Sequence, residues 1–100
     1  MRGAPSPIHG TGVFAVVDIA RGTHIGTYHG RPTDTDGTHV LWVEHGSGWR
    51  LTDGTGVLRW LNHSSRPNAE FDGVELYALS RIEAGTEVTI HYGEEWTDVP

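Results

Sequence analysis

Residues 59–68 have the sequence RWLNHSSRPN, and no other stretch of this chain combines so many unusual features. It opens with the apolar pair Trp60 and Leu61 and continues with Asn, His, Ser and Arg side chains around one Pro. This composition suits a partly buried, irregular segment whose polar groups are hydrogen-bonded by neighbouring residues. Segments of this kind often line ligand sites, so we expect the rest of the chain to be arranged around this one.

Length and composition indicate one mostly β domain. The 100 residues correspond to a single domain, which we place at residues 1–100. The chain has 14 Gly and 36% hydrophobic residues, and no long segment has a helical period. We therefore expect short strands joined by tight turns.

Apolar patterning predicts where the strands lie. The expected strands are residues 13–17, 23–28, 39–44, 49–52 and 86–92, with one helical turn at 57–61. A hairpin joins residues 69–71 to 74–80 through an Asp-Gly pair, which favours a type I′ turn. Residues 1–9 and 31–38 contain Pro and few apolar residues, so we expect an irregular lead-in and a loop.

The last predicted strand has a clear period of two. Val88, Ile90 and Tyr92 share one face, and Glu87, Thr89 and His91 share the other. We expect Tyr92 to end the core-facing row, with its ring buried and its hydroxyl pointing out of the strand end into a site.

Charge and residue usage exclude several classes of function. The formal net charge is −6, and the seven cationic side chains are all Arg. An acidic balance argues against direct nucleic-acid binding and fits a basic protein or peptide partner. No apolar run approaches roughly 18 residues and no apolar leader follows Met1, so we expect no membrane contact and a cytoplasmic location. Cys is absent and the seven His are scattered, so we expect no metal site.

Two further features have both a plain and a functional interpretation. Gly10-Thr11-Gly12 precedes a strand instead of following one, which excludes a dinucleotide-binding fingerprint. Its missing side chains would let backbone approach a ligand closely, although an ordinary turn would use the same glycines. Tyr92 is either a functional hydroxyl or a strand-end aromatic residue. Ser64 beside His63 cannot form a nucleophile–base pair, since adjacent side chains diverge, and Glu94-Glu95 is expected to be a solvated acidic end.

Several motifs occur in a fixed order along the chain. They are GTGVFA from residue 10, IARGTHI from residue 19, YHG from residue 28, the stretch at residue 59, and EVTIHYGEEW from residue 87. Together they resemble the SET domain of protein-lysine methyltransferases, over residues 8–96. The resemblance implies a β-clip-like fold of small curved sheets, with a C-terminal pseudoknot between the Asn-His-Ser segment and the final Tyr segment. It also implies that the protein transfers a methyl group from S-adenosylmethionine to a lysine ε-amine.

The resemblance assigns six residues to the cofactor. They are Gly10, Thr11, Gly12, Arg59, Asn62 and His63. The glycine-containing turn would hold the methionine end of S-adenosylmethionine. Arg59 would help with its carboxylate, and Asn62 and His63 would contact it partly through their backbone.

On the lysine side, the resemblance makes Tyr92 the catalytic tyrosine and places Tyr28 in the lysine channel. Trp96 would supply an aromatic wall of that channel, or else cap the core, and a partner subunit of a homodimer could supply the wall instead. Ser65 stands where a zinc-binding Cys is usual, so a minimal domain without zinc is expected. His91 replaces a common Asp, which leaves open an alternative: a non-catalytic SET-like module that binds a peptide or cofactor without turnover.

Overall fold

Short strands dominate the protein, whose fold is given by a computed structural model. The structure describes residues 1–45, 48–93, 96 and 99–100. Within these residues it has ten strands, one 3₁₀ turn and no α-helix, and nothing in this part of the chain is a helix long and apolar enough to span a membrane. The strands are β1 Arg2–Pro5, β2 Thr11–Phe14, β3 His24–Thr27, β4 Gly30–Thr33, β5 Val40–His45, β6 Gly48–Gly54, β7 Asn62–His63, β8 Ala69–Asp72, β9 Glu75–Ala78 and β10 Glu87–Ile90, and the 3₁₀ turn η1 is Val57–Trp60.

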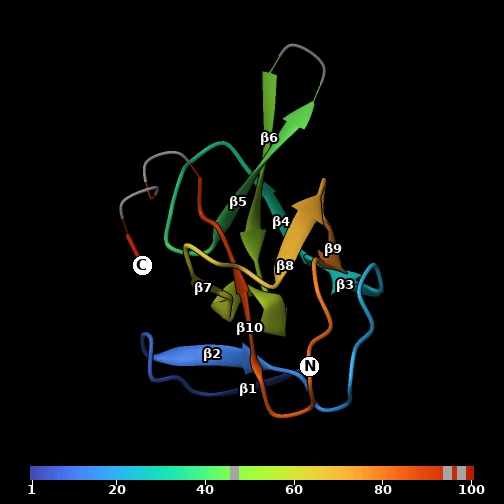
Figure 1. Cartoon of the computed structure of the whole chain (residues 1–100). Coiled ribbons are helices and arrows are strands. Elements are labelled where there is room, and N and C mark those ends of the chain that lie inside the picture. Colours follow the sequence, from blue (N-terminus) through green and yellow to red (C-terminus); the bar gives the residue numbers. More distant parts are fainter. Residues whose placement is uncertain (46–47, 94–95, 97–98) are drawn as a thin grey trace.

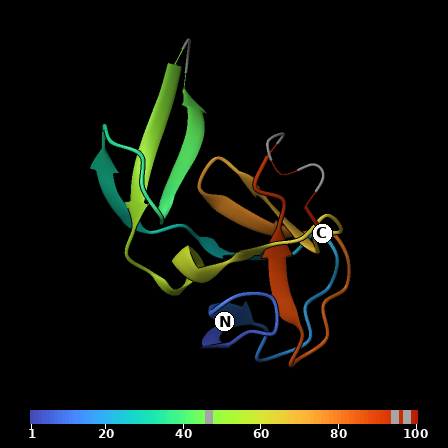
Figure 2. The same cartoon turned by 90° about the vertical axis from the view of Figure 1, so that its left-hand side faces the viewer.

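The strands form three small sheets. Their strand orders are β1-β2-β10-β7, β3-β9-β8 and β4-β6-β5. Figure 1 and Figure 2 show the β5–β6 hairpin projecting at one end of the molecule and the β1–β2 hairpin at the other, with β10 running between them. The expected mostly β fold of small sheets is confirmed, and the helical turn expected after residue 57 forms as η1.

Two Pro-containing segments that we expected to be irregular are strands. β1 contains Pro5 and β4 contains Pro32. Both strands lie at the edge of their sheet. The outer side of an edge strand has no neighbouring strand to bond to. A Pro there, which lacks an N–H, costs the sheet no hydrogen bond and is tolerated. The expectations of a lead-in at residues 1–9 and a loop at 31–38 were therefore wrong for residues 2–5 and 31–33, whereas residues 6–9 and 34–38 are irregular as expected.

The hairpin of β8 and β9 forms, but its turn differs from the one expected. Asp72 pairs with Glu75, which leaves Gly73 and Val74 as the two loop residues. Gly73 has a φ of 62°, and no non-Gly residue in the described part of the chain has a positive φ. A type I′ turn needs positive φ at both central positions, so that prediction was wrong; positive φ at the first position alone is typical of type II′. The β5–β6 hairpin forms as expected, and its turn residues 46–47 lie outside the described residues, as do Glu94-Glu95.

The core lies where the sheets meet. Its largest fully buried side chains are Val13, Leu76, Ile82 and Val88. Val13 on β2 and Val88 on β10 are register partners, and burial of each aliphatic side chain of this size stabilises the fold by about 1.5–3 kcal/mol. These contacts hold β10 in the centre of the molecule.

Burial in β10 does not follow the expected period of two, and the strand ends before Tyr92. Val88 is buried as expected, and Thr89 on the opposite face is buried as well. The strand ends at Ile90, and the residue Tyr92 is 43% exposed. The expectation that Tyr92 extends the buried row was therefore wrong: it lies beyond the strand, where neighbouring strands no longer cover both faces.

Candidate active site

The shortest strand, β7, organises the site. It contains only Asn62 and His63, both buried, and pairs parallel with β10 so that Asn62 lies opposite Thr89. It follows directly on Leu61, which is also buried. Because successive side chains of a strand point to opposite faces, Asn62 and His63 serve opposite sides of this layer.

The Asn62 side of β7 holds the turn between β1 and β2. The Asn62 Nδ2 group donates hydrogen bonds to the carbonyl of His9 (3.1 Å) and to Glu87 Oε2 (2.9 Å). The same Glu87 carboxylate accepts a hydrogen bond from Ser6 Oγ at 2.7 Å. Three segments distant in the sequence are thus joined around one amide and one carboxylate.

The glycines of this turn have two different reasons to be Gly. Gly10 has a φ of 45°, and a Cβ there would meet nothing within 4 Å. At Gly12, a Cβ would collide with the Glu87 carboxylate. Thr11 between them is exposed. The turn therefore packs on the protein at Gly12 and leaves Gly10 and Thr11 open, which fits a ligand held by backbone groups.

The His63 side of β7 holds the segment that contains Tyr92. The Tyr92 backbone N–H donates to His63 Nδ1 (3.0 Å), so the hydrogen of the neutral ring lies on Nε2 and is donated to the carbonyl of Val99 (2.8 Å). The imidazole also contacts the rings of His91, Tyr92 and Trp96 at centroid distances of 4.6, 5.3 and 5.2 Å. Both ring nitrogens are occupied by protein groups, so any contact of His63 with a cofactor would be through its backbone.

Tyr92 and Trp96 stand together at the end of this cluster. Their rings are 4.8 Å apart in an edge-to-face arrangement. The Tyr92 hydroxyl donates to the carbonyl of Leu61 at 2.6 Å, at the residue just before β7. Burial of the phenol, followed by the negative charge of Glu87, raises the pKa of Tyr92. Its hydroxyl is therefore a neutral donor at physiological pH.

Tyr28 lies deeper than Tyr92. It is buried, packs edge-to-face on Phe71 at 5.7 Å, and its hydroxyl donates to the carbonyl of His39. Burial and the neighbouring Asp53 carboxylate raise the pKa of Tyr28 to about 12. A Cβ at Gly54 would collide with the Tyr28 hydroxyl, so the absence of a side chain at this position makes room for the phenol.

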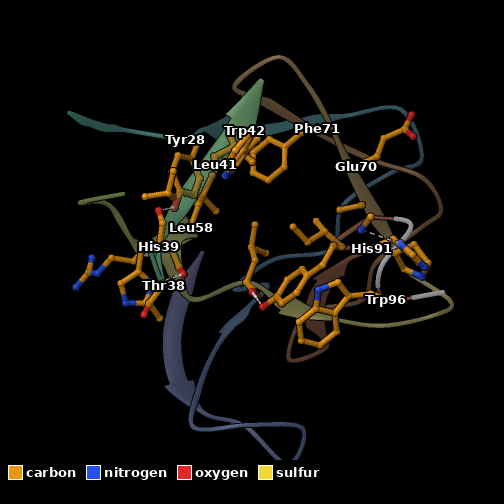
Figure 3. Close-up of a pocket in the computed structure, with 18 of the residues that line it drawn as sticks. Tyr28, Thr38, His39, Leu41, Trp42, Leu58, Glu70, Phe71, His91 and Trp96 are labelled. Atoms are coloured by element: carbon orange, nitrogen blue, oxygen red, sulfur yellow. Dashed lines mark hydrogen bonds between the residues drawn. The ribbon is translucent and has the colours of Figure 1, made fainter. Parts of the chain in front are cut away.

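A cleft of about 1100 Å³ brings Tyr28, Tyr92 and Trp96 together. Figure 3 shows Tyr28, Leu41, Trp42 and Phe71 on one side of its opening and Trp96 on the other. The three residues expected in a lysine channel are thus on the wall of one cleft, although their roles stay predictions.

Arg59 is the expected cofactor residue that the structure places elsewhere. Its guanidinium donates to the carbonyls of Thr55 and Gly56 and lies 3.9 Å from the centre of the Trp60 ring. It lines the cleft, whereas Gly10 to Gly12 and Asn62 do not. Its contact with a cofactor carboxylate stays a prediction. No group of three or more His, Asp or Glu in the described part of the chain could hold a metal ion.

Sequence reasoning missed two residues of this site. Glu87 was assigned only to a strand face, yet its carboxylate joins Ser6 to Asn62. Gly54 had no assigned role, yet it makes room for Tyr28. The one sequence signal for Glu87 is the alternation that places it on the face of the strand opposite to Val88. No local signal marks Gly54.

Comparisons with known proteins point to one family. The family model for the SET domain matches residues 10–93. Among solved structures, the methyltransferase domain of human PR domain-containing protein 2 is 22% identical with a TM-score of 0.71, covering 94% of this chain and 78% of that one. A structure of ctPRC2 in complex with H3K27me3 and H3K27M is 20% identical with a TM-score of 0.77, covering 92% of this chain but only 14% of that one. A search of curated proteins found no match.

Proposed function

The chain belongs to the SET domain family, and on this premise we propose that it is an S-adenosylmethionine-dependent protein-lysine N-methyltransferase. Its substrate would be a basic, lysine-bearing protein segment. One observation carries the proposal: adjacent residues of β7 hold the two halves of the site, Asn62 the open glycine turn and His63 the tyrosine beside the cleft. A donor bound at the turn and a lysine entering from the cleft would meet across this layer.

The cofactor side of the site fits a ligand with a charged methionine end. When bound, S-adenosylmethionine supplies an electrophilic methyl group on a sulfonium. Gly10 and Thr11 would offer backbone groups to it, and Asn62 would keep the turn in place through His9. Glu87 would keep the Asn62 amide oriented and would add negative charge near a cationic ligand.

The lysine side acts by positioning. Methyl transfer to a neutral amine needs no metal and no covalent intermediate, so alignment of the reacting groups contributes most of the rate enhancement. The Tyr92 hydroxyl and the carbonyl of Leu61 would orient the incoming amine by hydrogen bonds. Since the pKa of each phenol is raised, neither Tyr28 nor Tyr92 is a phenolate base at neutral pH. Desolvation of the lysine, whose free pKa is about 10.4, would favour loss of its proton.

We also propose that β7 and β10 form the pseudoknot typical of the family. Their parallel pairing joins segments that are far apart in the sequence, and the Ser64 N–H extends it by donating to the carbonyl of Ile90 at 2.9 Å. We also keep the homodimer in the proposal, because a partner subunit could supply residues to the wall of the cleft.

A paired assay tests the function. Transfer of labelled methyl groups to a basic protein extract should be strong with the wild type and nearly lost with Tyr92→Phe. Tyr77→Phe is the matched control, because Tyr77 lies on β9 against His24 and does not line the cleft. The chain contains no Lys, so label on the enzyme itself is confined to its N-terminal amine and gives a low background.

Calorimetry with S-adenosylmethionine separates the two candidate functions. Binding together with transfer supports the enzyme. Binding without transfer would indicate the non-catalytic module instead. Absence of binding would remove the enzyme altogether, and equal transfer by wild type and Tyr92→Phe would remove Tyr92 from the mechanism.

A further inference from the structure

Two Trp side chains are exposed side by side on the projecting hairpin. Trp42 on β5 is 47% exposed and Trp49 on β6 is 57% exposed. In the register of these strands Trp42 faces Leu51, so Trp49 is its diagonal neighbour on the same face. The two rings meet edge-to-face at 5.9 Å. An exposed pair of the largest apolar side chains on a small domain indicates a contact surface.

A carboxylate accompanies the pair. Asp36 Oδ1 accepts a hydrogen bond from Trp42 Nε1 at 3.0 Å and another from the Gly37 N–H at 2.8 Å. These contacts hold an anionic group against the edge of one indole. Indole faces and a carboxylate both attract cations, so the three side chains form one electronegative surface.

This surface belongs to the cleft that contains the candidate active site. Asp36, Trp42 and Trp49 line the same cleft as Tyr92 and Trp96. Figure 3 shows Trp42 beside Tyr28 and Phe71, across the opening from Trp96. A peptide in the cleft that presents a lysine to Tyr92 would therefore present a neighbouring side chain to the hairpin.

Charge favours a cationic occupant. The chain carries a net charge of −6 and has no Lys. Arg59, which lines this cleft, donates to the carbonyls of Thr55 and Gly56 and lies over the Trp60 ring. That stacking also shows, within the same molecule, how a guanidinium lies on an indole. Arg59 is thus held by contacts of its own, and the negative charge of the chain favours a cation supplied by a partner at the exposed Trp pair.

We propose that Trp42, Trp49 and Asp36 form a subsite for an arginine side chain of the substrate, near the lysine that is methylated. This inference rests on the proposed function, because it names a feature of the segment that enters the same cleft. Arginine suits the surface better than lysine: its planar guanidinium stacks on an indole face while its N–H groups remain free to pair with a carboxylate. The subsite would thus favour substrates with Arg close to the target lysine.

Binding of a lysine-free peptide tests the subsite without any methyl transfer. Two fluorescein-labelled peptides are compared by anisotropy with the full chain, one containing Arg and the other containing neutral citrulline in the same positions. We expect the wild type to prefer the Arg peptide by about threefold to about thirtyfold. Asp36→Asn keeps an oxygen acceptor for Trp42 but removes the charge, and Trp49→Leu keeps an apolar side chain but removes the ring, so each should lower the preference.

Asp72→Asn is the matched control, since it makes the same change of charge at an exposed residue at the end of β8, outside the cleft. If it lowers the preference as much as Asp36→Asn does, bulk charge explains the binding and the subsite is overturned. Equal binding of the two peptides by the wild type also overturns it. So does a homodimer that Trp49→Leu dissociates while peptide preference is absent, because the pair would then contact a second copy.

The outcomes separate this inference from the proposed function. If methyl transfer fails while the Arg preference and its loss in the variants persist, the subsite stands and the enzymatic proposal falls. If methyl transfer succeeds while lysine peptides flanked by Arg and by citrulline have equal KM, only the subsite falls.

Discussion

Replacing Asn62 by Asp tests the contact on which the proposed cofactor side depends. The substitution preserves shape but turns the Nδ2 donor into a carboxylate oxygen. That oxygen would lie about where Nδ2 now meets Glu87 Oε2 at 2.9 Å and the carbonyl of His9 at 3.1 Å. Two hydrogen bonds would become two repulsive contacts, one of them between full negative charges.

The expected cost is large for a single isosteric change. Two unit charges at this separation repel by about 6 kcal/mol with an effective dielectric constant of about 20. Local relaxation and partial exposure of Glu87 reduce this, so we expect a loss of about 3–5 kcal/mol from the free energy of unfolding at neutral pH. A domain of this size has about 5–15 kcal/mol in total, so much of the fold's stability would be lost.

Urea unfolding as a function of pH provides the assay. In the variant the two carboxylates share a site, so one of them keeps a proton in the folded state at a pH where the unfolded chain has released it. The folded state then binds more protons than the unfolded state, and stability is regained as pH falls from about 8 to about 4.5. In a Glu87→Gln background the same substitution should cost several kcal/mol less. The contact would be refuted if Asn62→Asp lowered the free energy of unfolding by less than about 1 kcal/mol, equally with Glu87 and with Glu87→Gln, at about pH 8 and about pH 4.5.

Three further predictions follow from the cleft side. Gly54→Ala should lower the free energy of unfolding by about 1–3 kcal/mol, because the added methyl group would collide with the Tyr28 hydroxyl. Gly56→Ala is the control, since the added methyl group would have its nearest neighbour at 3.6 Å. Equal urea midpoints for the two variants would contradict this packing. Because the pKa of Tyr28 is raised to about 12, the unfolded chain releases this proton first, so stability should fall between about pH 10 and about pH 12. The free energy of unfolding of Tyr28→Phe, measured by urea titration, should change less with pH over this window. Identical pH profiles for the variant and the wild type would argue against a buried phenol. Trp96→Leu should raise KM roughly three- to tenfold with little change in kcat, since it removes an aromatic contact beside Tyr92; a change confined to kcat would exclude a wall of the channel.

The sequence predicts the strands of this fold better than its edges. Strands with apolar alternation, such as that around Val88, were expected because burial on a sheet imposes a period of two. β1 and β4 were not, because Pro5 and Pro32 break the pattern that marks a central strand. Whether a Pro-containing segment pairs depends on its being at an edge, and edge position is a property of the whole sheet.

The site shows the same division between local and distant information. The family resemblance assigned the turn at Gly10 and Asn62 to one cofactor; the structure joins the two through the carbonyl of His9, and their shared role stays a prediction. They did not predict that Glu87 holds both, since its contact with Ser6 spans 81 positions of the sequence. The direction of the Arg59 side chain was also beyond prediction, because it depends on the carbonyls of Thr55 and Gly56, which precede the 3₁₀ turn.

The two halves of the site depend on one strand register. Asn68 sets that register: its Oδ1 accepts the Thr89 N–H and its Nδ2 donates to the carbonyl of Glu87, both at 2.9 Å. A slip of β10 by one residue would turn the Glu87 carboxylate away from Asn62 and would move the Tyr92 N–H away from His63. Affinity for the proposed cofactor and placement of the Tyr92 hydroxyl should therefore be lost together in variants that weaken Asn68, although Asn68 belongs to neither half. The two losses should be coupled because one two-residue strand, β7, holds both halves of the site, one on each face.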